Sequence, residues 1–162
     1  NYNFKEIIKS NFWTGEYFLD DLSGKKYVSG DANTFPYYTG VFTSKSMMKS
    51  SMRKLEQEGL DKPFPLKYTK ALNQNKHFSF MEIVAPNYEG NTNWIHLGLC
   101  YINVVNKVDK QKAGKYIEQY TQIIKRHKNF LEVFNHNKKP YQNMFYYCDE
   151  GMLWVANYLN MI

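Results

Sequence analysis

The sequence predicts an all-α fold: about three helical hairpins that form an (α/α) toroid, equivalent to half of a six-hairpin barrel, with a small β-hairpin near the N-terminus. The main observation is that amphipathic and almost wholly apolar helical segments alternate along the 162 residues, as the outer and inner helices of a ring do. A long polar loop precedes each apolar segment, so all three loops are expected at the same end. With 43% hydrophobic residues, the chain is expected to form a single domain over residues 1–162, with no internal boundary.

The first third of the chain should contain a short helix, the β-hairpin and a long helix. Asn3 can cap a helix over residues 4–12, and the aromatic residues of segment 13–28 favour the hairpin. After a loop at 29–34, a Pro near the start and a Gly at the end delimit a helix over residues 35–59.

The middle third should contain an inner helix. Residues 66–72 are compatible with a short helix, and the apolar residues 78–84 with the end of that element or with a strand. A polar loop at 86–91 leads into a helix over residues 94–106 that is apolar nearly all round. A helix of that kind belongs in the interior.

The last third should contain a further outer and inner pair. Asp109 caps an amphipathic helix that continues to about residue 128, with most of its lysines on the outer face. A long polar loop over residues 129–149 follows. Residues 150–162 are again mostly apolar and predict a second inner helix.

Composition excludes several kinds of protein and site. No apolar run approaches the roughly 20 residues that span a bilayer, so no membrane segment is expected. The net charge is +6, but the basic residues of segment 107–128 are interspersed with acidic ones, which is typical of a solvated face rather than a nucleic-acid site. The four histidines form no i, i+4 pair of metal ligands and no glycine-rich phosphate loop occurs, so no metal and no cofactor are expected.

The two cysteines, Cys100 and Cys148, have aromatic or aliphatic neighbours and are expected to be buried and free. This usage indicates a reducing compartment, so we expect a cytoplasmic protein. The sequence begins at Asn1 rather than Met and shows no signal-peptide pattern. We therefore expect it to begin within a longer polypeptide.

The three polar loops contain most of the side chains that packing alone does not explain. The candidates for substrate contact are Asp31, Asn33, Tyr88, Glu89, Trp94, Asp149, Glu150 and Trp154. Aromatic rings stack on the apolar faces of a sugar, while carboxylates and amides bind its hydroxyl groups. Loops that converge with these residues would form a sugar-binding cleft.

Four segments carry motifs that occur in the same order in a known family. They are Gly-Asp-Ala-Asn-Thr-Phe-Pro (30–36), Gly-Asn-Thr-Asn-Trp-Ile-His-Leu-Gly-Leu (90–99), Phe-Leu-Glu-Val-Phe-Asn (130–135) and Phe-Tyr-Tyr-Cys-Asp-Glu-Gly-Met-Leu-Trp (145–154). Together they resemble the C-terminal half of the amylo-α-1,6-glucosidase (glycogen debranching enzyme) group, which is related to glucoamylase, trehalase and the processing glucosidases. The resemblance implies an inverting glycoside hydrolase that acts on α-glucosyl linkages of an oligosaccharide or glucan.

The resemblance also implies roles for individual residues. Glu132 matches the general base that activates water, and Trp154 matches the Trp that ends the last motif. An inverting mechanism needs the acid and the base about 6.5–9.5 Å apart. Asp31 matches a substrate-contact loop better than the acid. The general acid is therefore expected outside this chain, in the rest of the catalytic barrel from the same or a partner chain, and the isolated chain is expected to be inactive.

Two other interpretations stay open. A non-catalytic carbohydrate-binding or scaffold domain would use the same loops, and a basic helical domain would bind nucleic acid with an affinity that falls steeply with salt. Half a ring would also expose apolar edges, which predicts self-association. The motifs leave open the linkage and the chain length of the substrate.

Overall fold

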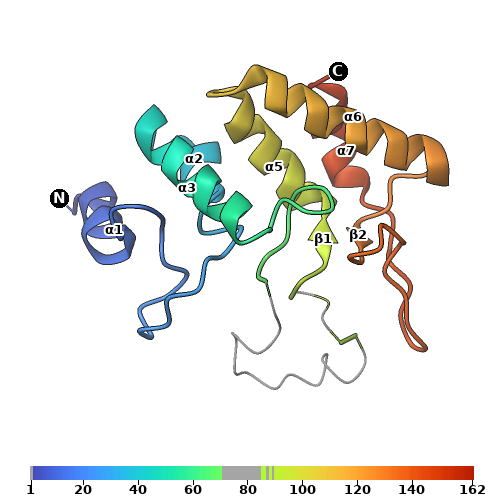
Figure 1. Cartoon of the computed structure of the whole chain (residues 1–162), viewed down its shortest axis with the longest axis horizontal. Coiled ribbons are helices and arrows are strands. Elements are labelled where there is room, and N and C mark those ends of the chain that lie inside the picture. The colour runs from blue at the N-terminus through green and yellow to red at the C-terminus, as the bar shows by residue number, and fades with distance from the viewer. Residues whose placement is uncertain (1, 71–84, 87, 89) are drawn as a thin grey trace.

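The computed structural model describes residues 2–70, 85, 86, 88 and 90–162. Its helices are α1 (Phe4–Phe12), α2 (Phe35–Tyr38), α3 (Lys45–Gln57), α5 (Ile95–Asn106), α6 (Lys110–His127) and α7 (Met152–Leu159), and its strands are β1 (Asn93–Trp94) and β2 (Val133–Phe134). In Figure 1, α1, α2 and α3 lie to the left of α5, and α7 and β2 lie to its right. Helix α5 is therefore the centre of the arrangement.

The prediction of an all-α toroid is wrong, because the described residues combine six helices with a small antiparallel sheet. In that sheet Asn93 lies opposite Phe134, and Trp94 lies opposite Val133. The segment predicted as a polar loop, residues 129–149, thus returns to pair with the backbone just before α5. Val and Phe favour extended pairing, and the pairing supplies hydrogen-bond partners to backbone groups that are buried.

Single antiparallel backbone pairings continue this sheet on both sides. They join Lys67 to Asn93, Phe134 to Pro140, Gln142 to Tyr147, and Leu131 to Glu150. The short helix expected over residues 66–72 is not formed in the described part of that range, because Lys67 joins the sheet instead. The element expected at 78–84 lies outside the described residues.

The β-hairpin expected over residues 13–28, all of them described, is also not formed. A tight turn is present in its place, closed by Thr14, whose Oγ1 accepts the N–H of Tyr17 at 3.0 Å. The side-chain amide of Asn33 accepts the N–H of Phe18 at 2.8 Å and donates to the Phe18 carbonyl at 2.9 Å. Across this turn the antiparallel backbone pairing is limited to one bridge, between Trp13 and Phe18. Side-chain hydrogen bonds to the backbone hold the rest of the turn.

Helix boundaries agree with the prediction where a capping residue marks them. The side chains of Asn3 and Asp109 accept the backbone N–H three residues further on, at 3.3 and 2.9 Å, and so cap α1 and α6.

The helix expected over residues 35–59 is divided into two helices, α2 and α3. Gly40, with a φ of 80°, follows α2 and ends it, and Ser44 caps α3.

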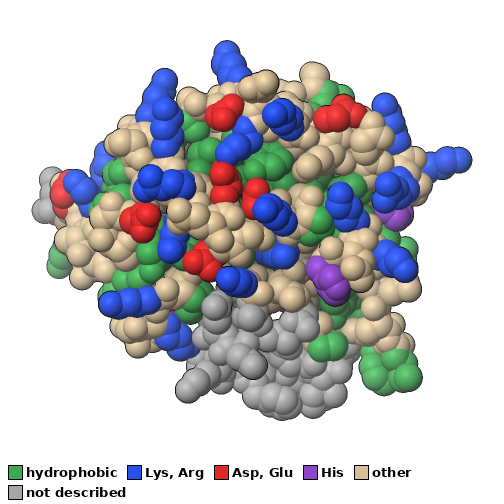
Figure 2. Space-filling model, in the orientation of Figure 1, with side chains coloured by type: hydrophobic (Ala, Val, Ile, Leu, Met, Phe, Trp, Pro, Cys, Tyr) green, Lys and Arg blue, Asp and Glu red, His purple; other side chains and the backbone are tan. Residues whose placement is uncertain are grey.

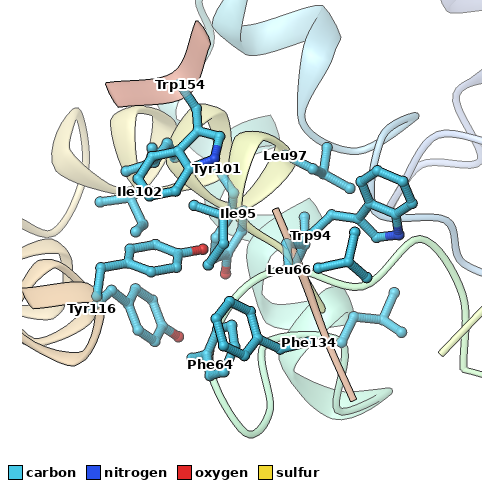
Figure 3. Packing of buried hydrophobic residues seen from close by; sticks show 14 of the residues in the cluster. Phe64, Leu66, Trp94, Ile95, Leu97, Tyr101, Ile102, Tyr116, Phe134 and Trp154 are labelled. Atoms are coloured by element: carbon cyan, nitrogen blue, oxygen red, sulfur yellow. The ribbon is translucent and has the colours of Figure 1, made fainter. Parts of the chain in front are cut away.

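Helix α5 is buried on nearly every side, as its apolar sequence predicts. It packs against α2, α3, α6 and α7. Figure 3 shows Ile95, Tyr101 and Ile102 of this helix among buried residues from the neighbouring elements. Gly98 allows α5 and α6 to pack closely, because a Cβ there would lie 1.8 Å from the hydroxyl oxygen of Tyr120 on α6. On this side of α5 there is no space for a larger residue.

The face of the molecule in Figure 2 carries many charged side chains. Lys and Arg side chains are spread over the visible face in Figure 2, with acidic side chains among them. Helix α6 is amphipathic, as predicted, and buries one stripe of four residues, Ala113, Tyr116, Tyr120 and Ile123. Among the helices in the described part of the chain, none combines the length and the apolar character that a bilayer span requires.

Candidate functional site

Backbone hydrogen bonds bring Glu132 to the N-terminal ends of α5 and α7. The carbonyl oxygen of Glu132 accepts the N–H of Ile95 at 3.0 Å, and the N–H of Glu132 donates to the carbonyl of Asp149 at 3.0 Å. Two residues earlier, the carbonyl of Phe130 accepts the N–H of Gly151 at 2.8 Å. Glu132 is therefore held from both sides by the backbone at the start of two helices.

A cavity of about 550 Å³ lies beside this carboxylate, within the size range of small-molecule sites. It is lined by His96 and Cys100 of α5, by Glu132, and by Glu150, Gly151, Trp154 and Asn157 at α7. Three residues predicted for the site, Glu132, Glu150 and Trp154, thus share one cavity. Below we call it the Glu132 cavity.

The carboxyl group of Glu132 is half-buried, and the loss of contact with water raises its pKa above the ordinary value for Glu. The hydroxyl of Tyr88 donates to Oε2 of Glu132 at 3.4 Å and lowers this pKa, whereas the negative charge of Asp149 raises it. Burial is the largest of these effects, so the pKa is raised overall. A carboxylate of this kind is a stronger base than one in water.

Trp154 forms an aromatic wall of the Glu132 cavity. Its side chain is 3% exposed, and its ring centre lies 5.4 Å from that of Phe130 in an edge-to-face contact. A Cβ on Gly151 would lie 2.0 Å from the indole Nε1, so this ring position requires glycine. Nε1 is buried and has no acceptor among the described residues, which is uncommon for a buried donor. The indole N–H of Trp154 is therefore a donor without an acceptor among the described residues.

Tyr88 and Trp94 were predicted as sugar contacts, but neither lines the Glu132 cavity. The ring of Tyr88 makes edge-to-face contacts with Trp94, Tyr141 and Tyr146, at centre-to-centre distances of 4.7, 5.5 and 5.0 Å. Trp94 is 7% exposed, and its Nε1 donates to the carbonyl of Tyr88 at 2.9 Å. The two rings pack against other aromatic side chains, and only the hydroxyl of Tyr88 reaches Glu132.

Asp31 and Asn33 do not line the Glu132 cavity either. Asn33 is 1% exposed, and its amide is occupied by the backbone of Phe18 and by the carbonyl of Ser29 at 3.0 Å. The carboxylate of Asp31 accepts a hydrogen bond from the hydroxyl of Ser29. In this structure both side chains shape the loop before α2 rather than the cavity.

Asp149 and Glu150 lie at a second cavity of about 320 Å³, which Glu150 shares with the first. Its other lining residues are His127, Asn129, Leu131, Tyr147 and Cys148. Glu150 is exposed, and its Oε1 accepts a hydrogen bond from the side-chain amide of Asn129 at 2.8 Å. Glu89 lies outside the described residues.

The sequence argument did not place His96, Cys100 or Asn157 at the site. His96 and Cys100 are four residues apart on α5 and therefore share one face of the helix, a spacing that is visible in the sequence. The Tyr68 hydroxyl lies 3.2 Å from Nε2 of His96, and burial lowers the pKa of the ring, which favours the neutral imidazole. Both cysteines are buried and free, as predicted, and burial raises the pKa of the Cys100 thiol.

The described residues contain no group of three or more His, Cys, Asp or Glu side chains that could hold a metal ion. Comparisons with protein-family models, curated proteins and solved structures found no match for this chain. The resemblance to the glucosidase family rests on the four sequence motifs alone and stays a prediction.

Proposed function

We propose that this chain is part of an inverting glycoside hydrolase that acts on α-glucosyl linkages of an oligosaccharide or glucan, with Glu132 as the general base. The observation that supports this proposal most is that Glu132, Glu150 and Trp154 line one cavity of about 550 Å³. Sugar sites combine an aromatic surface, which covers the apolar face of a ring, with carboxylates that bind hydroxyl groups.

In the proposed reaction, Glu132 removes a proton from a water molecule as that water attacks the anomeric carbon, on the face opposite the leaving oxygen. Burial raises the pKa of Glu132 and so makes the carboxylate a better proton acceptor than a solvated one. Trp154 would lie against the sugar ring, and Glu150 would bind a hydroxyl group. The general acid that protonates the leaving oxygen would come from the rest of the enzyme, in the same or a partner chain.

The substitution Glu132→Gln tests this role, because glutamine keeps the shape of the side chain but cannot accept the proton. We expect hydrolysis of maltose, isomaltose or a branched α-glucan by the complete enzyme to fall by about 10²–10⁴-fold, with sugar binding retained. Proton NMR should detect the β-anomer of glucose as the first product. Glu118→Gln is the matched control, since Glu118 is exposed on α6. Equal activity of the two variants would contradict the proposal.

A sugar-binding domain without catalysis is the second candidate. The observation in its favour is that Glu150, the second carboxylate of the Glu132 cavity, is exposed and accepts a hydrogen bond from Asn129, an arrangement suited to binding. Calorimetric titration of the chain with maltose separates the two. Binding that survives Glu132→Gln, with no turnover by the complete protein, would support this second function. Binding to nucleic acid that weakens steeply with salt would contradict both.

A further inference from the structure

The position of Tyr88 does not suit the role of a sugar platform. Three rings, those of Trp94, Tyr141 and Tyr146, surround its ring in edge-to-face geometry, with interplanar angles of 73°, 64° and 72°. The part of Tyr88 that reaches the functional site is the hydroxyl, which lies 3.4 Å from Oε2 of Glu132. Among the described residues that line the Glu132 cavity, the one that the Tyr88 hydroxyl contacts is Glu132.

The backbone N–H and carbonyl of Tyr88 are also hydrogen-bonded. The N–H of Tyr88 donates to the carbonyl of Ala85 at 3.2 Å. The carbonyl of Tyr88 accepts hydrogen bonds from the hydroxyl of Thr92 and from Nε1 of Trp94. Because ring and backbone are both held, the hydroxyl has a defined position relative to the carboxylate.

A count of protons defines the direction of the hydrogen bonds. The hydroxyls of Tyr88 and Tyr146 are 2.8 Å apart, and each phenol has one proton to donate. An ionised Glu132 only accepts, so the proton of Tyr88 points to Glu132 and that of Tyr146 points to Tyr88. Two hydroxyls in series then stabilise the carboxylate, because each hydrogen bond polarises the next.

We propose that Tyr88, supported by Tyr146, is a positioning residue that holds Glu132 in one orientation and favours its ionised form. The proposal deepens the proposed function and rests on it, since an oriented, ionised carboxylate is what a general base requires. Burial and the charge of Asp149 both favour the protonated form of Glu132. Among the described residues named as acting on this carboxylate, Tyr88 is the one that opposes them.

The substitution Tyr88→Phe removes the donor and leaves the ring. We expect the pKa of Glu132 to rise, with the acid dissociation constant falling by up to about tenfold, because burial and Asp149 then act unopposed. Tyr146→Phe should shift the pKa in the same direction but less, because Tyr88 still contacts Glu132. Tyr141→Phe is the matched control: its ring belongs to the same cluster, but its hydroxyl donates to the carbonyl of Pro86.

The measurement is the titration of the Glu132 side-chain carboxyl carbon by NMR in ¹³C-labelled protein without substrate, with Glu132→Gln used to identify the signal. Amide spectra of each variant check that the fold is retained. A Glu132 titration that is the same in Tyr88→Phe as in Tyr141→Phe would overturn the proposal. In an active enzyme the acid limb of the pH profile of kcat/KM should move to higher pH in Tyr88→Phe.

Failure of this proposal and failure of the proposed function give different results. If the titration shifts but the complete enzyme hydrolyses no α-glucoside, Tyr88 positions Glu132 and the glucosidase function is wrong. If Glu132→Gln abolishes hydrolysis but Tyr88→Phe leaves both the titration and the pH profile unchanged, Glu132 is catalytic and the role assigned to Tyr88 is wrong.

Discussion

The two sides of helix α5 differ in how completely they are filled. Toward α6, Gly98 lies against Tyr120 and Pro65 so closely that a Cβ would come within 2.4 Å of the Pro65 carbonyl oxygen. Toward α7, His96 and Cys100 border a cavity of about 550 Å³. Helix α5 thus has a closely packed side and a side that borders a cavity. We call the first the α6 side and the second the α7 side. Substitutions on the α6 side should mainly change stability, and those on the α7 side should mainly change the site.

The largest effect is expected from Gly98→Ala, on the α6 side. The added Cβ would lie 1.8 Å from the Tyr120 hydroxyl oxygen and 2.4 Å from the backbone of Pro65, so the helices must move apart. We expect the free energy of unfolding to fall by about 3 kcal/mol in urea titrations. Gly114→Ala is the control, because nothing lies within 4 Å of its Cβ position on α6. That change should stabilise the chain by about 0.5–1 kcal/mol.

A glycine-to-alanine substitution on the α7 side should lower the free energy of unfolding by a smaller amount. In Gly151→Ala the Cβ would lie 2.0 Å from Nε1 of Trp154, but the obstacle is a side chain beside a cavity into which it can move. We expect a loss of about 1 kcal/mol in urea titrations, with a change in tryptophan fluorescence and weaker sugar binding. A loss as large as that of Gly98→Ala would show that the two sides are equally rigid.

A smaller, pH-dependent effect is expected from Asp61→Asn, beside α6. Burial raises the pKa of Asp61, although the Tyr116 hydroxyl donates to its Oδ2 at 2.9 Å and lowers it. The folded chain then holds this proton more tightly than the unfolded chain, so stability is lost as pH rises through the pKa of the folded state. The free energy of unfolding of the variant relative to the native chain should therefore increase between pH 4 and pH 7.

Urea titrations at both pH values measure this difference. Glu118→Gln on the exposed face of α6 should leave the pH dependence as it is in the native chain. A constant difference between Asp61→Asn and the native chain over this range would mean that Asp61 has the same pKa folded and unfolded. Burial raises the pKa of both Asp61 and Glu132. Asp61 does not line the Glu132 cavity, so its substitution tests stability rather than the site.

Some features of this fold were predictable because they depend on neighbours in sequence. A cap such as Asn3 or Asp109 acts on an N–H three residues away, and the apolar sequence of α5 indicates burial whatever surrounds it. The pairing of Trp94 with Val133 was not predictable in this way. Short extended segments have weak local signals, and their partners are chosen by long-range packing. The prediction of an all-α toroid was wrong because it did not include this pairing of strands.

The candidate site shows the same division. The sequence alone determined which residue types were available, including Glu132, Glu150 and Trp154, which the fold then brings to one cavity. Only the tertiary structure decided that Asn33 holds the backbone of Phe18 and that Tyr88 points its hydroxyl at Glu132. A polar or aromatic residue in a loop has the same local signature whether it binds a ligand or another part of the chain. Its role depends on groups that are distant in sequence, because a side chain's hydrogen bonds are completed by whatever the fold brings within about 3 Å.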